Sequence, residues 1–366
     1  MRPRDVIPST EVNIADDRLR RSLNVLRRGI DDSAMPGAVV CAFRRGQMFL
    51  HTALGTVDGA RPATVETIYD LASLTKPLAT ASSALVLVEQ GRLALTDTLP
   101  SLLGDAAAHL AGVTVRHLLT HTSGLPAWTP CYENGEGLDA AVAAILRLTA
   151  APADARYEYS CLGFILLGKI LETVTGQSLD MFARENVFVP LGLDEMTYLP
   201  PEEMFPRIAP TRSAESVGHA TGETLTGTVH DGNARGIGGV SGNAGLFGTA
   251  LDVALFGDTI RQGAACRAGL FGAPATARIF SSQIPPEVGA HTLLFFAQGN
   301  GLCPSGDLLS PRAVGHSGFT GTLLTIDPKY DLTVALLTNR VFSDPDGTRF
   351  LAVRRRFLNA LAAALC

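Results

Sequence analysis

The sequence predicts an α+β fold: an antiparallel sheet built from both ends of the chain, flanked by helices, with a mainly helical second lobe. Two pairs of apolar runs predict the sheet, because short runs separated by turn residues are typical of hairpins. One pair covers 38–43 and 48–54, and the other covers 322–326 and 332–337. The Ala- and Leu-rich composition of 77–171 predicts the helical lobe.

Helices are predicted where apolar residues recur every three or four positions. This spacing indicates an opening helix that begins near Leu19 and ends between 31 and 36, and a closing helix over 351–365. Between them, helices are expected at 79–89, 139–149 and 162–173. The glycine-dense segment 236–245 is expected to be a loop whose backbone approaches a ligand or another segment closely.

These elements predict two lobes. Residues 1–76 and 235–366 are expected to form an α/β lobe around the sheet, and residues 77–234 are expected to form the mainly helical lobe. A chain of 366 residues is long enough to bury a large core in this way.

The charge pattern argues against a nucleic-acid or membrane partner. The net charge is −5, and no long block of Lys and Arg is interleaved with aromatic residues. A single basic cluster, Arg354–Arg356, is expected on the solvent side of the closing helix. The longest apolar stretch, 162–171, is interrupted by Lys169 and is too short to cross a bilayer.

The sequence favours a cytoplasmic protein. Its first thirty residues contain many Arg and Asp and no apolar segment typical of a secretory signal. The six cysteines are scattered without a Cys-x-x-Cys pair, which is typical of reduced thiols: Cys41, Cys131, Cys161, Cys266, Cys303 and Cys366. Oligomeric state is not predicted by any pattern in the chain.

The first candidate for chemistry is Ser73, which is followed three residues later by Lys76. Residues three apart share one face of a helix, so the Lys76 ammonium is expected within hydrogen-bonding reach of the Ser73 hydroxyl. A partly desolvated lysine can exchange protons, whereas arginine stays protonated. Lys76 is one of only three lysines among 30 Lys and Arg. The pattern favours an activated serine nucleophile.

Two further segments complete a candidate catalytic set. Tyr159 precedes a predicted helix, and a cation such as Lys76 would help its phenol to act as a general base. Residues 315–321 come just before a predicted strand, whose exposed edge would suit an extended substrate. In that geometry the backbone N–H groups of Phe319 and Ser73 form an oxyanion hole, and His316 faces the cleft.

The three motifs occur once each and in order: Ser73-x-x-Lys76, Tyr159-Ser160-Cys161 and His316-Ser317-Gly318. Together with 91–97, 114–126 and 326–328, they give the chain a specific similarity over roughly residues 15–340 to one superfamily. The chain resembles the serine β-lactamases and penicillin-binding proteins, in the branch of class C β-lactamases, D-alanyl-D-alanine carboxypeptidases and β-lactamase-like esterases.

The resemblance implies a β-lactamase/transpeptidase-like fold and a serine hydrolase that acts on small esters or amides through an acyl-Ser73 intermediate. It implies catalytic roles for Lys76 and Tyr159 as one coupled pair. Substrate contacts are implied for Cys161, His316, Ser317 and Gly318, with no metal and no organic cofactor. The substrate is expected to be a small-molecule ester, amide or β-lactam.

Two departures from the family pattern affect the substrate. The second motif is usually Tyr-x-Asn, and Cys161 offers only a weak donor and acceptor where the amide would contact substrate. In the third motif His316 replaces a lysine, so the fixed charge that attracts a carboxylate is lost or becomes pH-dependent. Both changes favour uncharged esters over β-lactams.

Other functions remain open from the sequence. A D-alanyl-D-alanine carboxypeptidase or β-lactamase that acts on cell-wall peptides or β-lactams is the nearest alternative. A protein that binds penicillin or cell-wall fragments without turnover is a second, favoured by Cys161. A zinc hydrolase is suggested by His117 and His121, four residues apart, although the Glu of a His-Glu-x-x-His site is missing.

Overall fold

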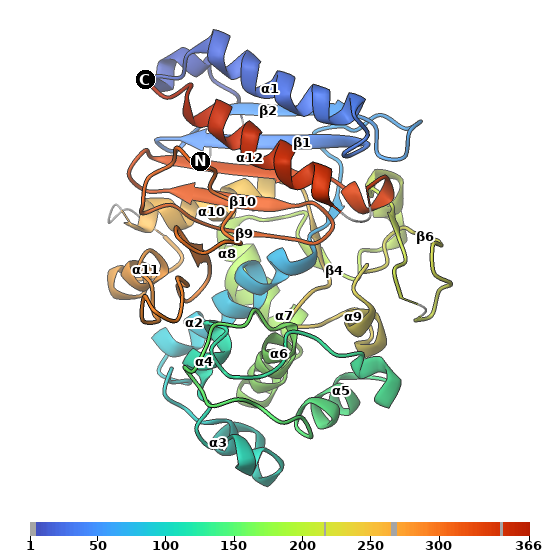
Figure 1. Ribbon diagram of the computed structural model, residues 1–366, viewed down its shortest axis with the longest axis vertical. Helices are drawn as coiled ribbons and strands as arrows, with labels where there is room; N and C mark the ends of the chain where they lie inside the picture. Colours follow the sequence, from blue (N-terminus) through green and yellow to red (C-terminus); the bar gives the residue numbers. More distant parts are fainter. Residues whose placement is uncertain (1–4, 216, 265–268, 345–346) are drawn as a thin grey trace.

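A computed structural model describes residues 5–215, 217–264, 269–344 and 347–366. Its main sheet has six antiparallel strands in the order β2-β1-β11-β10-β9-β8 (Figure 1). The strands are β1 (Gly37–Arg44), β2 (Gln47–Gly55), β8 (Phe296–Ala297), β9 (Val314–Ser317), β10 (Leu323–Asp327) and β11 (Leu332–Leu337). The sheet is therefore assembled from both ends of the chain, as the sequence predicts.

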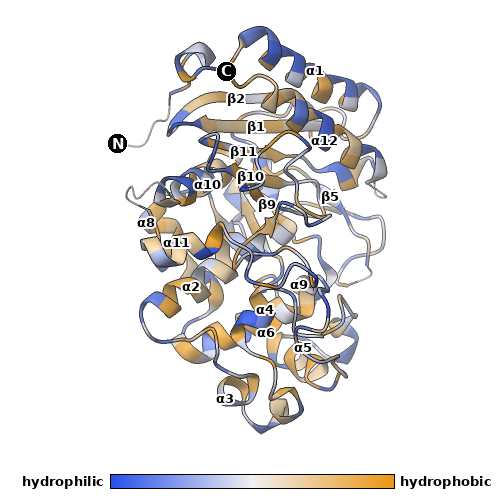
Figure 2. Cartoon of the chain, turned by 60° about the vertical axis from the view of Figure 1, so that its left-hand side comes forward, coloured by the Kyte–Doolittle hydropathy of each residue, from blue (hydrophilic) through white to orange (hydrophobic). Residues whose placement is uncertain are grey.

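The register joins the two ends of the chain directly. Val39 lies opposite Leu337 and Arg44 opposite Leu332, so the whole of β11 is paired with β1 from the N-terminal hairpin. Every residue of β1 and β11 is buried, which explains why both read as short, almost continuously apolar runs. In Figure 2, β1 is mostly hydrophobic.

Helices cover both faces of this sheet. The first and last helices, α1 (Asp16–Asp31) and α12 (Thr348–Ala362), pack together on one face. Figure 2 shows α1 with mixed hydrophilic and hydrophobic residues, the pattern of a helix that buries one side only. The other face packs on α10 (Ala250–Ala264), which leads into the main core of the protein.

The remaining helices lie below the sheet in Figure 1. They are α2 (Ser82–Glu89), α3 (Leu99–Leu103), α4 (Val115–Leu119), α5 (Leu138–Ile145), α6 (Cys161–Thr175), α7 (Leu179–Ala183), α8 (Val189–Leu191), α9 (Gly232–Ile237) and α11 (Ala273–Ile279). Short strands form two further sheets: β3 (Tyr69–Asp70), β7 (Leu246–Gly248) and β4 (Thr197–Tyr198), and then β5 (Thr211–Arg212) with β6 (Thr224–Leu225). No helix within the described residues is long and apolar enough to cross a membrane.

The predicted helices are present with shifted limits. The helix expected at 79–89 begins as a π-helical turn over Lys76–Ala81 and continues as α2. Helix α6 has clear end signals: the Ser160 hydroxyl accepts a hydrogen bond from the Gly163 N–H, and Gly176 ends the helix in the left-handed conformation. The segment 236–245 begins inside α9 and is otherwise irregular.

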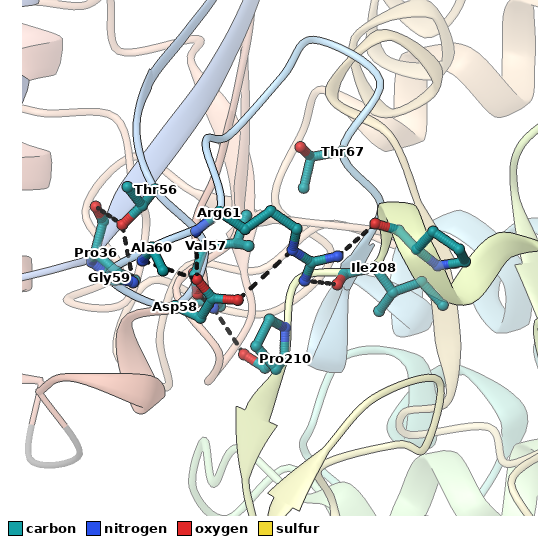
Figure 3. Close-up of polar contacts among 12 residues, drawn as sticks. Pro36, Thr56, Val57, Asp58, Gly59, Ala60, Arg61, Thr67, Ile208 and Pro210 are labelled. Atoms are coloured by element: carbon teal, nitrogen blue, oxygen red, sulfur yellow. Dashed lines mark hydrogen bonds and ion pairs between the residues drawn. The ribbon is translucent and has the colours of Figure 1, made fainter.

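A polar loop fixes the connection between β2 and β3 (Figure 3). The Asp58 carboxylate accepts hydrogen bonds from the N–H groups of Ala60 and Arg61 at 3.0 and 2.7 Å. The Arg61 guanidinium in turn donates to the Ile208 carbonyl at 2.7 Å. These contacts attach the loop to the 206–210 segment and so position the chain that leads into β3 and on to Ser73.

Candidate active site

Ser73 follows β3 in a tightly held turn. Asp70 at the end of β3 accepts hydrogen bonds from the N–H groups of Ala72 at 2.8 Å and His230 at 2.7 Å. Ala72 has a φ of +47°, which is unusual for a residue with a Cβ. Such strain is maintained only where the surroundings fix the backbone, and it places the Ser73 side chain in two adjoining cavities.

Lys76 is completely buried and its ammonium has three acceptors. It donates to Ser73 Oγ at 3.1 Å, to the Asn243 carbonyl oxygen at 2.9 Å and to Cys161 Sγ at 3.5 Å. The proximity of Ser73 and Lys76 is as predicted, but the two residues are not on one α-helix. Ser73 is in the 3₁₀ turn Ala72–Leu74, and Lys76 begins the π-helical turn.

The pKa values describe a site with one charged member. Burial alone would lower the pKa of Lys76, but the anionic forms of Cys161 and Tyr159, together with Asp231, outweigh burial and raise it. Burial raises the pKa of Tyr159, and it also raises the pKa of Cys161, in both cases against the opposing effect of Lys76. At neutral pH the resting site therefore holds an ammonium, a phenol and a thiol.

Tyr159 is held in place by the segment before α6. The neighbouring Ser160 N–H donates to His121 Nδ1 at 3.0 Å, and the Ser160 hydroxyl donates to the Pro126 carbonyl at 2.7 Å. Ser73 and Lys76 both oppose the effect of burial on the pKa of the Tyr159 phenol. The ring also lies beside the Lys76 ammonium, 5.0 Å from Nζ to the ring centroid. Ser73, Lys76, Tyr159 and Cys161 thus converge as the motif order predicts.

The third motif begins on β9 with His316 and Ser317 and comes just before β10, as the sequence predicts. The turn after β9 is attached to the Ser73 segment, because the hydroxyls of Thr320 and Thr322 donate to the carbonyls of Asp70 at 2.8 Å and Leu71 at 3.0 Å. Gly318 is required here, since a Cβ would lie 2.4 Å from the Leu71 carbonyl oxygen. The backbones of Phe319 and Ser73 are thereby brought to the same cavities.

The expectation that His316 faces the cleft is wrong. Its ring is only 1% exposed, because Phe296 of β8 stacks on it at 4.4 Å between ring centroids and Tyr159 lies on it at 5.9 Å. Burial holds the pKa of His316 well below its usual value, with Lys76 and His291 adding to the effect. His316 is therefore neutral, and it supplies no positive charge. Ser317 and Gly318 do line a cavity beside Ser73.

His316 belongs to a histidine cluster, formed by His121, His291 and His316. His121 is 4.5 Å from Tyr159 and 5.1 Å from His291 between ring centroids. Burial lowers the pKa of His121 well below its usual value and that of His291 to about 4. The cluster therefore surrounds one side of the Tyr159 ring with neutral imidazoles.

His117 and His121 do not face a common centre. His117 Nε2 contacts Asp154 at 3.1 Å and Arg116, whereas His121 points toward Tyr159. Within the described residues no group of three or more His, Cys, Asp or Glu side chains is placed to hold a metal ion. The contacts of each histidine are accounted for by ordinary local packing and hydrogen bonding.

Two cavities meet at Ser73, Tyr159 and Phe319. We call the first the acidic pocket: it measures about 350 Å³ and its other walls include Glu215, Asp231 and Cys161. We call the second the basic pocket: it measures about 330 Å³ and is bounded by Ser317, Gly318 and the arginines Arg340 and Arg354. A larger cavity of about 780 Å³, beside Tyr132 and Arg235, does not include Ser73.

Sequence reasoning missed several residues of this site. Asn243 accepts from Lys76 through its carbonyl, and its amide donates to Asp231 Oδ1 at 3.1 Å. The glycines around Asn243 predicted that this segment approaches another part of the chain closely. This is confirmed, because a Cβ on Gly242 would lie 1.9 Å from the Phe164 carbonyl oxygen. Trp128, His230 and Asp231 also line the acidic pocket, in loop segments whose conformation no periodicity specifies.

Solved structures of the same fold are similar to this one over nearly the whole chain. "EstCE1, a hydrolase with promiscuous acyltransferase activity" is 21% identical, with a TM-score of 0.76 and coverage of 94% of this chain and 99% of that one. The octameric penicillin-binding protein homologue from Pyrococcus abyssi is 22% identical, with a TM-score of 0.71 and coverage of 90% and 75%. The fold is thus that of β-lactamases and penicillin-binding proteins.

The family is established by sequence. The Beta-lactamase family model matches residues 24–356, so the chain belongs to this family, whose members are serine hydrolases. It is 31% identical to an N-acetylmuramyl-L-alanine amidase of Bacillus subtilis, over 92% of this chain and 84% of that protein. It is also 31% identical to a putative D-alanyl-D-alanine carboxypeptidase of Escherichia coli K12, over 77% and 71%.

Proposed function

We propose that this protein hydrolyses small esters or amides through an acyl-enzyme on Ser73. One observation carries the proposal: Ser73 Oγ lies 3.1 Å from the buried Lys76 ammonium, and the Tyr159 ring centroid lies 5.0 Å from the same ammonium. A nucleophile and a proton-accepting partner within hydrogen-bonding reach are what covalent catalysis requires. We also propose that the chain forms two lobes, with the site between them. One lobe consists of residues 1–76 and 235–366, and the other consists of residues 77–234.

In this mechanism the reactive form is the one in which the Lys76 and Tyr159 pair has released one proton to solvent. Ser73 Oγ attacks the substrate carbonyl, and the Ser73 proton passes to the vacated position on that pair. The buried pair acts as one unit, because each group changes the proton affinity of the other. The N–H groups of Ser73 and Phe319 stabilise the oxyanion of the tetrahedral intermediate. The pair then protonates the leaving group, and water hydrolyses the acyl-enzyme by the same route.

Cys161 and His316 favour esters within this proposal. The Cys161 thiol contacts Lys76, and a thiol is a poor partner for a substrate amide group. His316 is neutral and covered, so it does not replace the lysine that family members use for a carboxylate. An ester needs neither contact for its carbonyl to reach Ser73.

A second candidate, cleavage of cell-wall peptides or β-lactams, is favoured by the similarity to the amidase and the putative carboxypeptidase. The two candidates share Ser73 and differ in the acyl group that they transfer.

The test is hydrolysis of p-nitrophenyl butyrate by the wild type, by Ser73→Ala and by Ser101→Ala, a control on an exposed helix. We expect the Ser73 variant alone to lose turnover while it keeps its folded circular dichroism spectrum. Turnover that persists in Ser73→Ala would refute the nucleophile. No turnover in any of the proteins would refute the esterase and direct attention to D-alanyl peptides, β-lactams or binding without chemistry.

A further inference from the structure

Asp70 is a buried carboxylate that joins two segments of the candidate site. It is 2% exposed, and each of its two carboxylate oxygens accepts a backbone hydrogen bond. Oδ1 accepts from the Ala72 N–H at 2.8 Å, and Oδ2 accepts from the His230 N–H at 2.7 Å. Ala72 precedes Ser73, whereas His230 is 160 positions along the chain from Asp70. An amide has a single acceptor oxygen, so in this arrangement it would leave one of the two donors without a partner.

The charge on Asp70 is stabilised by these N–H groups rather than by an ion pair in the described part of the chain. Arg235 favours the ionised form of Asp70 but pairs with Glu215, at 3.6 Å. Burial raises the pKa of Asp70 to about 6, against the opposing effect of the two backbone N–H groups. The carboxylate is therefore mostly ionised at neutral pH. Its two backbone hydrogen bonds are charge-assisted, and such bonds are roughly twice as strong as those between neutral groups.

The hydrogen bond from the Ala72 N–H supports a strained conformation. Ala72 has a φ of +47°, a left-handed conformation that residues with a Cβ rarely adopt. A carboxylate that accepts from the N–H two residues later is a local contact that holds a tight turn. Because Ala72 directly precedes Ser73, its backbone angles set the direction of the Ser73 N–H and of the Ser73 side chain. Loss of the Asp70 contact would allow Ala72 to relax to negative φ and would move both groups.

Asp70 also contacts the turn that carries Phe319. The Asp70 carbonyl oxygen accepts from the Thr320 hydroxyl at 2.8 Å. Phe319, whose N–H is proposed for the oxyanion hole, stacks on the His230 ring at 5.6 Å between ring centroids. Both His230 and Phe319 line the acidic pocket beside Ser73. The nucleophile, the proposed oxyanion donor and one wall of the acidic pocket are therefore all attached to one residue.

We propose that Asp70 is a positioning residue for the hydrolysis: its carboxylate holds Ala72 in the left-handed conformation and joins the Ser73 turn to the His230 segment. The inference rests on the proposed function of Ser73 and adds a residue to it. Asp70 is buried and lines neither pocket that contains Ser73, so it does not touch the substrate. It acts through Ala72 on the alignment of Ser73 Oγ with the substrate carbonyl and with Lys76. Alignment affects the rate of acyl transfer more than the binding of the ester.

The test compares Asp70→Asn with a matched control, Asp252→Asn. Asp252 is also a buried carboxylate, 4% exposed, and burial raises its pKa to about 7. It lies at the start of α10, where it accepts from the Thr249 hydroxyl at 3.1 Å, and it lines neither pocket at Ser73. Values of kcat and KM for p-nitrophenyl butyrate are measured for the wild type and both variants. Each kcat is expressed per site that a fluorophosphonate probe labels to completion, so unfolded protein does not count.

We expect Asp70→Asn to lower kcat at least about tenfold, with KM within about twofold of the wild type, because the reacting groups are misaligned. Asp252→Asn should leave both constants within about twofold of the wild type. A merely structural role of Asp70 would reduce the number of labelled sites and leave kcat per site unchanged. An unchanged kcat in Asp70→Asn, or an equal loss in Asp252→Asn, would overturn the proposal.

A second substitution tests the route through Ala72. Glycine adopts positive φ without the steric cost of a Cβ, so Ala72→Gly should keep the turn formed when the Asp70 contact is weakened. We expect Asp70→Asn/Ala72→Gly to have a kcat about threefold or more above that of Asp70→Asn. No recovery in the double variant would overturn the route through Ala72.

Labelling kinetics separate this proposal from ester hydrolysis. The rate constant at which the fluorophosphonate modifies Ser73, followed by mass spectrometry of the Ser73 peptide, depends on the nucleophile and requires no ester turnover. We expect Asp70→Asn to be labelled at least about tenfold more slowly than the wild type, and Asp252→Asn at the wild-type rate. Equal rates in the wild type and Asp70→Asn would overturn the role of Asp70, whatever the ester kinetics show. No labelling of Ser73 in the wild type would instead refute the proposed nucleophile, and this inference with it.

Discussion

The two sides of the Tyr159 ring differ in charge. On one side Lys76 donates to Ser73, Cys161 and Asn243, so its ammonium is fully hydrogen-bonded. On the other side lies the histidine cluster, in which each Nε2 is buried and has no hydrogen-bond partner in the described parts of the chain. The comparison indicates that a single buried cation controls proton transfer at Tyr159, and that the cluster contributes packing without charge.

The hydrogen bonds of the histidine cluster fix its tautomers. His121 Nδ1 accepts from the Ser160 N–H, so its proton is on Nε2. His291 and His316 contact the carbonyls of Thr292 and Ser317 through Nδ1, at 2.6 and 3.1 Å, so their protons are on Nδ1. Burial lowers the pKa of all three and holds them neutral, although these backbone contacts act in the opposite direction. Adding a proton to any of them would place a second charge beside Lys76.

The largest loss of activity should follow removal of the Lys76 ammonium. Lys76→Met removes the ammonium and its three hydrogen bonds, and we expect kcat/KM for the best ester to fall about 10³-fold. Lys169→Met removes a lysine that pairs with an exposed aspartate and should leave kcat/KM within about twofold. Steady-state kinetics of both variants test the comparison, and equal losses in the two would contradict it.

Tyr159→Phe should have the next largest effect. The change removes only the phenol oxygen, whose pKa Ser73 and Lys76 lower, and the expected loss of kcat is about 10²-fold. Tyr157, two residues earlier, packs against His291 and is the matched control. A loss in Tyr157→Phe as large as in Tyr159→Phe would show that the effect is not specific to the Tyr159 hydroxyl.

A substitution of Cys161, which contacts Lys76, should have a smaller effect, on substrate preference. Cys161→Asn places an amide where the thiol contacts Lys76, and we expect the rate of amide or β-lactam cleavage relative to ester cleavage to rise about tenfold. Cys366→Asn, at an exposed cysteine, is the control. Parallel assays with nitrocefin and p-nitrophenyl butyrate give the ratio, and no change would show that Cys161 does not determine this preference.

The histidine cluster should affect the free energy of unfolding rather than the rate of catalysis. The pKa of His291 is about 4 when folded and near 6.5 when unfolded, so between these values the unfolded chain binds the extra proton. His291 therefore lowers the free energy of unfolding as pH falls from 6.5 toward 4, by up to about 1.4 kcal/mol per pH unit. Buried Asp70 and Asp252, with pKa values raised by burial to about 6 and about 7, act in the opposite direction.

The contribution of His291 to the pH dependence of stability is measured by comparing variants. Urea unfolding of the wild type and of His291→Asn at pH 4.5, 5.5 and 6.5 should show a shallower loss of stability at low pH in the variant. His109→Asn, at an exposed histidine, should keep the slope of the wild type. Identical slopes for the wild type and His291→Asn would mean that His291 is not buried as a neutral ring.

The sheet and the first two motifs were predictable because their signals are local. The apolar runs of β1 and β11 and the Ser73 to Lys76 spacing depend only on neighbouring residues. The Lys76 contact with Asn243 joins residues 167 positions apart, and no periodicity specifies it. The burial of His316 was missed because Phe296, which covers it, comes from a two-residue strand.

The expectation that Arg354–Arg356 lie on the solvent side of α12 is wrong for Arg354, which is partly buried and lines the basic pocket. Its orientation shows a second limit of sequence reasoning. A run of three arginines indicates a solvated face, but consecutive helical residues cannot all point the same way. Which of them turns inward depends on how α12 sits on the sheet and on α1, and that contact is tertiary. Cys266 lies outside the described residues, and the remaining five cysteines are free thiols as the scattered spacing suggests.

The most direct test of the central claim is to trap the covalent intermediate. Wild-type protein turning over p-nitrophenyl butyrate is quenched in acid, digested and analysed by mass spectrometry. The account predicts a butyryl group on the peptide that contains Ser73, and its absence from Ser73→Ala. A butyryl group on Cys161, or steady turnover with no adduct at Ser73, would contradict the account.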